Sequence, residues 1–472
     1  MAEWLADARP ATLGALRAAG YPDRSVKQEV AANAAARLRA GQPVVDGLIG
    51  FEQTVLPALE TALLAGHDLI LLGERGQAKS RIIRSLVTLL DPAVPIIAGS
   101  EVNDHPYHPF TPAARRLVAD HGPDTPLEWI GCDRRYAEKL ATPDIAVADL
   151  IGDVDPIKVA EGRYLGDAET IHFGLIPRHN RGIIAINELP DLAERIQVAL
   201  LNVMEERDIQ VRGYSLRLPL DLLVVTTANP EDYTNRGRII TPLKDRFGSE
   251  VRTHYPLTTE HEVAVMQAEA AGPSGEGLPA VIVPTFMAEV LAAFTRSLRQ
   301  APEVNQRSGV SVRFSTGNHE TLAASAVRRA VRAGEDTAVA RPSDLPAVIA
   351  ASMGKVEFES FEEGREVDVM TRLLRRSLLE VFRRRVRGAD VAGLLDAFET
   401  GLEVTTGDLM SGRDLMGQMD RIPGLAAVMH GLGVEEDPEL AAAAVELCLE
   451  GLHLSRRLDR HESDEGYTYV QA

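Results

Sequence analysis

The sequence predicts an α/β fold: a parallel sheet with helices on both faces, followed by helical segments. Three observations lead to this prediction. Between residues 47 and 256, short aliphatic runs alternate with helical patterns, and such alternation is typical of parallel sheets. From residue 257 onward, apolar residues recur at helical spacing. Hydrophobic residues make up 45% and charged residues 25% of the chain, which is ordinary for folded proteins and excludes wholesale disorder.

The net charge, the lengths of the apolar runs and the cysteine count argue against a nucleic-acid-binding protein, a membrane-spanning protein and a disulfide-rich protein. The 472 residues include 50 Lys and Arg against 69 Asp and Glu, a net charge of −19, so we expect no general binding of nucleic acid phosphates. No run approaches the ~18 apolar residues of a membrane-spanning helix, so we expect no membrane span and a cytoplasmic protein. The two cysteines, Cys132 and Cys448, are too few for a disulfide framework and are expected to be buried thiols.

The α/β segment spans residues 47–256 and is preceded by a helical lead-in over residues 1–46. In the lead-in, apolar and alanine residues recur at helical spacing from Thr12 to Ala40. A long connection over about residues 101–173 is expected to be an insert, because long connections on a rigid sheet are usually functional or mobile. The predicted strands are His67–Leu72, Val94–Ala98, Gly182–Ile186 and Leu222–Thr227. The predicted helices are Ser80–Leu90 and Asp191–Met204.

Two helical segments follow the α/β segment. Residues 257–354 form a helical block with a loop at Gly272–Gly277, and residues 355–472 form a helical extension. Within the extension, Arg372–Arg387 carries two arginine runs but spaces its apolar residues for one buried face. We therefore interpret it as an amphipathic helix with a cationic solvated face rather than a nucleic acid patch. The last residues, 462–472, are expected to form a frayed tail.

A phosphate-binding loop follows the first predicted strand. Its residues are Gly73-Glu74-Arg75-Gly76-Gln77-Ala78-Lys79-Ser80. In the pattern G-x-x-x-x-G-K-[ST], backbone N–H groups wrap the phosphates, the lysine reaches the β and γ oxygens, and the hydroxyl holds Mg²⁺. Lys79 and Ser80 suit these roles, and the one departure is Ala78 in place of the second glycine. Its methyl group is a mild change if Ala78 has helical dihedral angles and a serious one if the position needs a positive φ.

Two further predicted strands end in polar residues that suit ATP hydrolysis. The strand Gly182–Ile186 leads to Asn187 and Glu188, where enzymes of this kind carry Asp-Glu. We expect Glu188 to activate the attacking water and Asn187 to accept a hydrogen bond from Mg²⁺-bound water, without the negative charge of an aspartate. The strand Leu222–Thr227 leads to Asn229, which we expect to orient the attacking water together with Glu188.

These motifs resemble the AAA+ ATPases, and within them the branch that contains the magnesium chelatase I subunit and the MoxR proteins. The resemblance covers about residues 49–332. Its most specific part is Leu150–Asp155 and then Phe173–Gly182, which runs into the third predicted strand. The resemblance implies an AAA+ nucleotide-binding domain over residues 47–256 and a helical lid over residues 257–354, followed by a C-terminal helical extension. It also implies that the insert projects from a ring.

The resemblance assigns two more parts of the nucleotide site. Arg313, at the start of a predicted lid helix, is the candidate for the family's second sensor arginine, and Arg328 or Arg329 within that helix is the alternative. Ile49 and Gly50 match the pair that flanks the adenine ring in the family.

The same resemblance implies a ring. Leu243–Gly248 is similar to the family's arginine-finger segment, so Arg246 would enter the neighbouring subunit's site and stabilise γ-phosphate charge. ATP and Mg²⁺ are the implied cofactors, and hydrolysis would need a homo-oligomer, by family likeness a hexamer. The implied activity is the remodelling of a partner, or metal insertion, together with a protein that contains a von Willebrand A domain.

Alternative functions remain open at this point. One is a true magnesium chelatase subunit that drives Mg²⁺ insertion into protoporphyrin IX, although nothing in the chain indicates porphyrin binding. Another is a non-hydrolysing, nucleotide-gated binding module, which Ala78 and Asn187 motivate. A σ54 activator is disfavoured, because the chain lacks a Gly-Ala-Phe-Thr-Gly-Ala loop and a C-terminal helix-turn-helix with a basic reading face.

Three metal-binding residue types occur in the expected insert. They are His105, His108 and Cys132, and their spacing lacks the paired pattern of metal ligands. We therefore do not assign a metal site to them.

Overall fold

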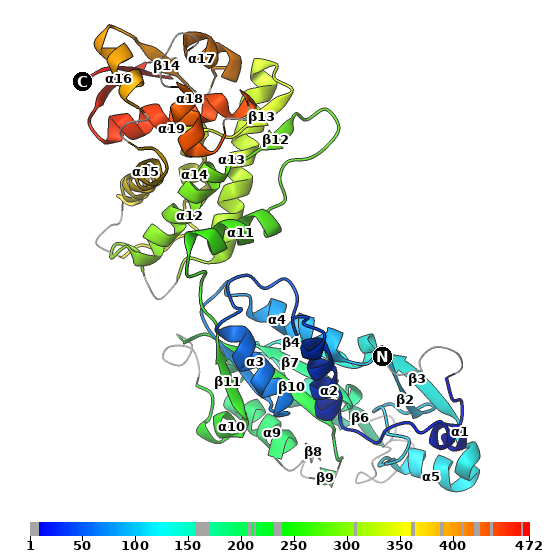
Figure 1. The fold of residues 1–472 in the computed structure, drawn as a ribbon. Coiled ribbons are helices and arrows are strands. Elements are labelled where there is room, and N and C mark those ends of the chain that lie inside the picture. Colours follow the sequence, from blue (N-terminus) through cyan, green and yellow to red (C-terminus); the bar gives the residue numbers. More distant parts are fainter. Residues whose placement is uncertain are drawn as a thin grey trace. The chain divides into compact units, whose positions relative to one another are not determined.

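The computed structural model divides the chain into two compact units, Met1–His254 and Tyr255–Ala472, which we describe separately (Figure 1). The expected finer division into four segments stays a prediction. The structure describes residues 9–155, 170–205, 209–211, 214–216, 218–230, 238–305, 309–359, 364–387, 391–407, 409–419, 425–434, 438–463 and 466–472. Parts of the expected insert and of the expected tail, residues 156–169 and 464–465, lie outside the described residues.

A five-stranded parallel sheet forms the centre of the first unit. Its strand order is β11-β1-β10-β7-β4, so strands that are distant in sequence lie side by side. Each strand is short and mostly aliphatic, as expected for strands that are buried on both faces. The bounds are β1 Leu69–Leu72, β4 Tyr136–Leu140, β7 Gly182–Asn187, β10 Leu222–Ala228 and β11 Ser249–Arg252. The predicted α/β fold with a parallel sheet is confirmed.

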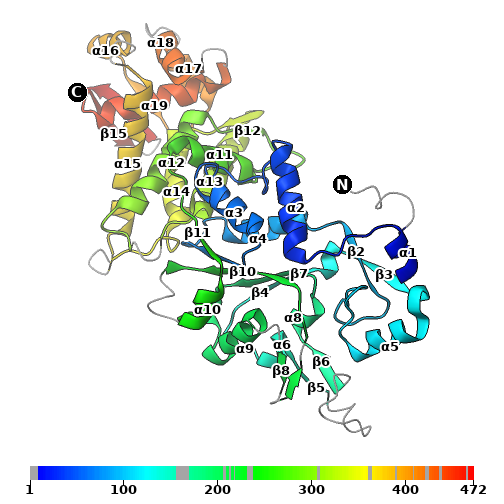
Figure 2. The same cartoon turned by 60° about the horizontal axis from the view of Figure 1, so that its bottom comes forward.

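Helices cover both faces of this sheet (Figure 2). Alternate residues of β1 face opposite layers: Leu69 and Leu71 pack in one core, and Ile70 and Leu72 in the other. The first core includes residues of α2 Val26–Arg39, α3 Val55–Leu64 and α4 Lys79–Ser85, and the second includes residues of α6 Val147–Leu150, α8 Leu175–Arg178, α9 Glu194–Glu205 and α10 Thr241–Arg246.

The predicted helical lead-in exists but belongs to this layered unit. It contains α1 Leu13–Ala18 and α2, which is capped by Ser25. Glu29 of α2 forms a buried bidentate ion pair with Arg135, at N–O distances of 2.7 and 2.8 Å. Because Arg135 immediately precedes β4, this pair fixes α2 to the central sheet.

The second predicted strand lies outside the central sheet. β2 Ala93–Ile97 pairs antiparallel with β3 Leu127–Gly131, and β4 occupies the sheet edge instead. Pro95 within β2 has no N–H to donate, which suits a strand in a two-stranded ribbon better than one in the interior of a sheet. Since β4 lies within residues 101–173, that segment is not a simple insert. The other described elements of this unit are α5 Pro112–His121, the pair β5 Gly152–Val154 and β6 Ile171–Phe173, and the pair β8 Ile209–Val211 and β9 Tyr214–Leu216.

The second unit is mainly helical and has a continuous core. That core extends from Val263 to Tyr469, so the expected lid and the expected extension pack together. The expected loop at Gly272–Gly277 lies between α11 and the short strand β12. The helices are α11 Thr259–Glu269, α12 Thr285–Gln300, α13 Val312–Ala333, α14 Leu345–Ser352, α15 Glu366–Arg385, α16 Ala392–Glu399, α17 Gly412–Met419, α18 Leu425–Leu432 and α19 Ala441–Leu454, and β12 Ala280–Ile282 pairs with β13 Thr337–Val339.

The arginine-rich helix α15 is amphipathic, as predicted. Its apolar residues join the core, and three of its arginines pair with carboxylates of the same unit. Arg384 and Arg385 both contact Glu289, and Arg372 contacts Glu303 at 2.6 Å. These ion pairs therefore compensate part of the positive charge on this face of α15.

The predicted frayed tail is wrong. β15 Leu458–Ser463 and β16 Gly466–Gln471 form an antiparallel hairpin, and β16 also pairs with β14 Val404–Thr406. Glu450 of α19 accepts hydrogen bonds from Arg460 at 2.7 Å and from the Tyr469 hydroxyl at 2.7 Å. This anchor, together with burial of the Tyr469 ring, orders the end of the chain.

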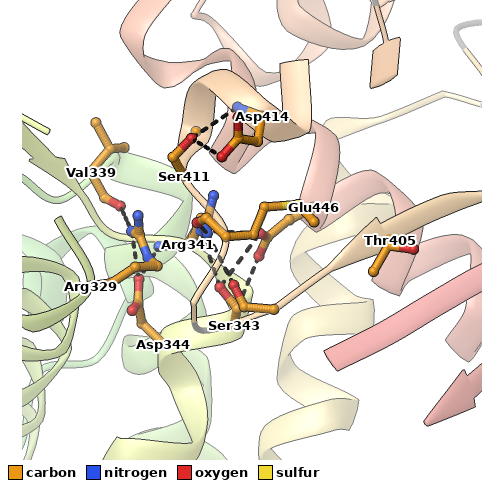
Figure 3. Close-up of polar contacts among 12 residues, drawn as sticks. Arg329, Val339, Arg341, Ser343, Asp344, Thr405, Ser411, Asp414 and Glu446 are labelled. Atoms are coloured by element: carbon orange, nitrogen blue, oxygen red, sulfur yellow. Dashed lines mark hydrogen bonds and ion pairs between the residues drawn. The ribbon is translucent and has the colours of Figure 1, made fainter. Parts of the chain in front are cut away.

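A buried ionic cluster links three helical segments of the second unit (Figure 3). Arg329 of α13 donates to Asp344 at 3.1 Å, and Arg341 contacts Glu446 of α19 at 3.1 Å. Arg341 also donates to the backbone carbonyls of Gly407 and Met410. We refer to Arg329, Arg341, Asp344 and Glu446 as the buried ionic cluster.

Over the part of the chain that the structure describes, helices long enough to cross a bilayer are not apolar enough to do so.

Candidate functional site

The predicted phosphate-binding loop connects β1 to α4. Its shape is held by Gln77, whose Oε1 accepts from the Glu74 N–H and the Thr253 hydroxyl, each at 3.0 Å. A Cβ atom on Gly73 would lie 2.0 Å from Thr253 Oγ1, so only glycine fits there. Gln77 and Thr253 therefore close the loop against the end of β11, a contact between distant segments that the motif alone does not reveal.

Ala78 has a φ of +56° and is left-handed. Of the two cases considered from the sequence, the structure therefore shows the one in which alanine is a serious departure from glycine. A side chain in this region costs roughly 1–2 kcal/mol relative to glycine. The Ala78 methyl group packs partly against the core formed by α2, α3 and α4, which offsets part of that strain.

Lys79 joins the loop to the end of β10. Its Nζ donates to Asn229 Oδ1 at 2.9 Å, to the Glu74 carbonyl at 2.7 Å and to the Gly73 carbonyl. Asn229 is buried, directly after β10. Two residues that the sequence assigned to the same chemistry thus meet at the carboxyl end of the sheet. Parallel strands end at one edge, which is where ligands bind in open α/β sheets.

An open pocket of about 330 Å³ adjoins this loop. Two of its side chains, Lys244 and Arg252, carry positive charge, and Glu74 carries negative charge. Its position beside the loop and its basic groups suit an anionic ligand. The lining residues are Leu72, Gly73, Glu74, Gln77, Pro230, Lys244, Arg252 and Thr253.

The end of β7 carries Asn187 and Glu188, both half-buried. Glu188 has a φ of +57°, and its N–H donates to Thr227 Oγ1 at 2.9 Å. The Thr227 hydroxyl in turn lies 3.4 Å from Asn187 Oδ1, within donor distance. Thr227, a residue of β10 without an assigned role in the sequence, therefore holds the turn that presents Glu188.

Glu138 of β4 is a member of this site that the motifs missed. Its Oε1 accepts from Asn187 Nδ2 at 2.6 Å. Arg84 of α4 donates to both oxygens of Glu138, at 2.8 and 3.0 Å, and the Tyr136 hydroxyl donates at 3.1 Å. The hydrogen bonds from Arg84 are the main cause that lowers the pKa of Glu138. A glutamate in an alternating strand is an inconspicuous signal, and only the pairing of β4 with β7 reveals the contact.

The residues present fit a magnesium ion bound with nucleotide phosphates. Mg²⁺ takes oxygen ligands and usually keeps several of its waters. Ser80 at the start of α4 offers a hydroxyl, Asn187 an amide oxygen, and Glu188 a carboxylate. These are the oxygen donor types that a hydrated Mg²⁺ ion requires.

The Ile49-Gly50 segment lies near α4, the helix that follows the phosphate-binding loop. Ile49 is half-buried, and Gly50 is buried with a φ of +79°. At Gly47, two residues before Ile49, a Cβ atom would lie 2.6 Å from the Arg81 guanidinium of α4. Arg81 directly follows Ser80, so this segment borders the loop, and the adenine-flanking role of Ile49 and Gly50 stays a prediction.

The arginines assigned by resemblance differ in exposure. Arg246 ends α10, is 44% exposed and pairs with Glu205 of α9. Arg313 is exposed in the first turn of α13, and Arg328 is exposed further along that helix. Arg329 is buried and its guanidinium pairs with Asp344 in the ionic cluster, which disfavours it as a sensor.

The histidines of the expected insert approach Asp23 rather than Cys132. His108 Nε2 lies 2.7 Å from an Asp23 oxygen and His105 Nε2 lies 3.9 Å from the other. Because the Tyr107 N–H donates to His105 Nδ1, the neutral ring carries its proton on Nε2, which leaves Nε2 no lone pair for a metal ion. Burial is the main cause that lowers the pKa of His105 to about 3. Cys132 instead donates to the Asp91 carbonyl.

Comparisons with known proteins agree with these motifs. The family described as the sigma-54 interaction domain matches residues 158–247. The 38 kDa subunit of magnesium chelatase from Cereibacter sphaeroides is 30% identical over 232 residues, which cover 46% of this chain and 61% of that subunit. The ChlI subunit of magnesium chelatase from Anabaena variabilis is 28% identical over 39% of this chain and 52% of that subunit.

A chain from the complex between the magnesium chelatase subunits BchI and BchD, obtained from a cryo-EM reconstruction, is also similar. It is 22% identical, with a TM-score of 0.35 over 67% of this chain and 97% of that chain. At that score nothing about function follows from it. The present chain spans between half and two thirds of the two curated relatives. The predicted resemblance is confirmed as a similarity: about half of this chain resembles the I subunits of magnesium chelatase in sequence.

Proposed function

We propose that this chain is an AAA+ ATPase that binds ATP with Mg²⁺ on the Gly73–Ser80 loop and hydrolyses it. The observation that carries the proposal is the meeting of Lys79 with Asn229 at the end of the sheet. Glu188 stands at the end of the adjacent strand β7, where a carboxylate can act on a water molecule. Sequence similarity to magnesium chelatase I subunits supports the same assignment.

The roles of the residues follow from their chemistry. The Lys79 ammonium group now donates to backbone carbonyls of the loop, and with nucleotide present it would donate to phosphate oxygens instead. Glu188 accepts a proton from the attacking water, and Asn229 orients that water. A bound Mg²⁺ ion supplies charge neutralisation for the phosphates, with the Ser80 hydroxyl as its protein ligand.

We further propose a ring, hexameric by family likeness, in which Arg246 completes the neighbouring site. The side chains of Arg246 and Glu205 are 44% and 36% exposed, so exchange of this ion pair for a phosphate contact costs little. An arginine finger typically contributes 10³- to 10⁵-fold to the rate. Hydrolysis per subunit should therefore rise with protein concentration and fall by about 10³-fold in Arg246→Ala.

A mixing experiment tests the contribution between subunits. Glu188→Gln and Arg246→Ala are each expected to be inactive alone. When they are mixed, an Arg246→Ala subunit keeps its own Glu188 and receives Arg246 from a Glu188→Gln neighbour. Recovery of hydrolysis supports the ring, whereas an inactive mixture of well-folded variants contradicts it. Arg134→Ala, which removes another exposed arginine with a carboxylate partner, is the matched control.

The work done by the ring is the finer part of the proposal. We propose that hydrolysis remodels a partner that contains a von Willebrand A domain, as in MoxR proteins, or drives metal insertion, as in magnesium chelatase. Glu188→Gln should retain ATP and trap the engaged partner. A pull-down with this variant, compared with Lys79→Ala as the nucleotide-free control, should recover such a protein only with the first bait. Equal recovery with both baits, or none with either, contradicts this part.

A second candidate is a nucleotide-gated binding module that does not hydrolyse ATP. Two specific observations favour it: the strained φ of Ala78 and the amide of Asn187 where an aspartate is expected. Tight ATP binding without hydrolysis at every protein concentration, with and without the partner, would favour the module over the motor.

A further inference from the structure

Asn187 and Glu138 form a hydrogen-bonded pair across two parallel strands. Register places Leu140 of β4 beside Asn187 of β7, and Glu138 two residues earlier, on the same face as Leu140. The distance between Glu138 Oε1 and Asn187 Nδ2 is 2.6 Å. The strand that resembles the Asp-Glu strand of AAA+ ATPases thus has an amide at its aspartate position, with a carboxylate on the neighbouring strand.

The four acceptor positions of Glu138 are filled by donors. Oε1 accepts from Asn187 and Arg84, and Oε2 accepts from Arg84 and the Tyr136 hydroxyl. An ionised carboxylate has about four acceptor positions and no proton to donate. Glu138 is 19% exposed, so this set of contacts holds it firmly in one orientation.

This arrangement fixes the orientation of the Asn187 amide. Because Glu138 can only accept, the NH₂ group of Asn187 must face it. The amide oxygen then faces away from Glu138, and the Thr227 hydroxyl contacts it at 3.4 Å. Thr227 also holds the Glu188 N–H, so the Asn187 oxygen lies on the side of the turn that presents Glu188.

An aspartate at position 187 would be incompatible with this neighbour. Two carboxylates at a hydrogen-bond distance cannot both be ionised near neutral pH, because one of the two pKa values rises strongly. The acid and the amide are therefore interdependent: Glu138 requires a donor at position 187, and the amide requires an acceptor at position 138.

We infer that Glu138 is a positioning residue, which turns the Asn187 amide so that its oxygen, and not its NH₂ group, is offered to the water shell of nucleotide-bound Mg²⁺. The inference rests on the proposed function, since it assigns a role toward the same metal ion. On this view, the carboxylate that an Asp-Glu pair carries at position 187 is instead supplied by Glu138 on the adjacent strand. The amide then accepts from metal-bound water as an aspartate would.

The test measures Mn²⁺ binding to the protein–ADP complex by electron paramagnetic resonance, which needs no catalytic turnover. In Glu138→Gln, the new amide can donate as well as accept, so both orientations of Asn187 become possible. We expect the affinity for Mn²⁺ to fall about 10-fold, as for the loss of other groups that orient metal ligands. Asn187→Asp should make the affinity rise more steeply with pH than in the wild type, because two adjacent carboxylates compete for one proton.

The double variant Glu138→Gln/Asn187→Asp gives the decisive comparison. Here the glutamine introduced on β4 donates to the aspartate introduced on β7, so the pair is restored with acid and amide exchanged. We expect Mn²⁺ affinity within about 3-fold of the wild type, or tighter, and the steep pH dependence to disappear. If Glu138 only anchors Arg84, the two substitutions should lower the affinity additively or not at all, and either result overturns the inference.

Controls separate folding and function from positioning. Glu128→Gln on β3 is the matched control, because Glu128 also pairs with an arginine, Arg134, but does so on an exposed surface. Thermal unfolding of each variant identifies losses caused by misfolding, and the double variant keeps the test valid if one single variant is unstable. If the wild type binds neither ADP nor Mn²⁺, the proposed function itself fails. Unchanged Mn²⁺ affinity in a folded Glu138→Gln variant overturns only the positioning role.

Discussion

The candidate site of the first unit and the buried ionic cluster of the second each contain an arginine–carboxylate pair, Arg84 with Glu138 and Arg341 with Glu446, but in different surroundings. Glu188 and Asn187 are half-buried at the end of β7, and Lys79 is half-buried at the start of α4, directly after the left-handed residue Ala78. Arg341 and Glu446 are 1% and 2% exposed, and Arg341 also donates to two backbone carbonyls.

The difference teaches what each set of charges contributes. At the strand ends, partial exposure and a strained backbone leave polar groups available for a ligand, and such strain is typical of functional sites. In the ionic cluster, burial raises the pKa of Glu446, and Arg341 compensates for the charge. We therefore expect substitutions at the first site to change activity more than stability, and substitutions in the cluster to change stability more than activity.

The largest expected effect is on the rate of hydrolysis in Glu188→Gln. The amide cannot accept the proton of the attacking water, and loss of a general base typically costs 10²- to 10⁴-fold. ATP affinity and the unfolding temperature should stay near those of the wild type, because Glu188 is half-buried and its backbone contact to Thr227 remains. Phosphate release and calorimetric titration measure the two quantities. A variant that hydrolyses ATP at the wild-type rate would remove Glu188 from the mechanism.

The buried ionic cluster should show the opposite behaviour in Arg341→Met. This substitution leaves Glu446 buried without its arginine and removes donors from the Gly407 and Met410 carbonyls. Breaking a buried ion pair from one side typically costs about 3–5 kcal/mol. The matched control is Arg372→Met, whose exposed pair with Glu303 should contribute at most about 1 kcal/mol. Denaturant unfolding measures both, and equal losses would contradict the distinction.

The parts of this molecule that could be predicted from sequence are those that depend on neighbours in the chain. The loop, its lysine, and the polar residues after β7 and β10 follow from contiguous apolar runs that end in particular residue types. Because parallel strands end at one edge, the meeting of Lys79 with Asn229 follows as well.

The parts that could not be predicted depend on contacts between distant segments. Glu138 lies 49 residues before Asn187, and its role appears only once β4 is known to neighbour β7. β2 lies outside the central sheet although its aliphatic pattern resembles that of the other strands, in keeping with the proline it contains. The C-terminal hairpin depends on Glu450, which precedes it on α19 and gives no local signal for a strand.

A smaller effect concerns the pH dependence of stability in the first unit. The folded-state pKa of His105 is lowered to about 3, chiefly by burial and then by Arg181. In the unfolded chain the ring takes up a proton near pH 6.5, so the unfolded state binds more protons below that pH and stability falls as the pH is lowered. Between pH 7 and pH 5 the loss should be about 1–2 kcal/mol.

His105→Asn is the variant that tests this pH dependence, because asparagine can still accept from the Tyr107 N–H but does not titrate. Its unfolding free energy should decrease less steeply between pH 7 and pH 5 than that of the wild type. His121→Asn, the same substitution at an exposed histidine, is the matched control. Parallel slopes for all three proteins would show that His105 does not set the dependence.

The smallest expected effect concerns the backbone strain at Ala78. Ala78→Gly removes the Cβ from a residue with a φ of +56° and should increase the unfolding free energy by about 1 kcal/mol. The loss of the methyl packing and the greater freedom of glycine in the unfolded chain both reduce this gain. Ala199→Gly in α9, where the backbone is helical, should instead lower the unfolding free energy by about 1 kcal/mol. Opposite signs for the same chemical change would identify backbone strain as the cause. If both variants are destabilised equally, Ala78 carries no strain, and its methyl group then offers no support for a weakened nucleotide loop.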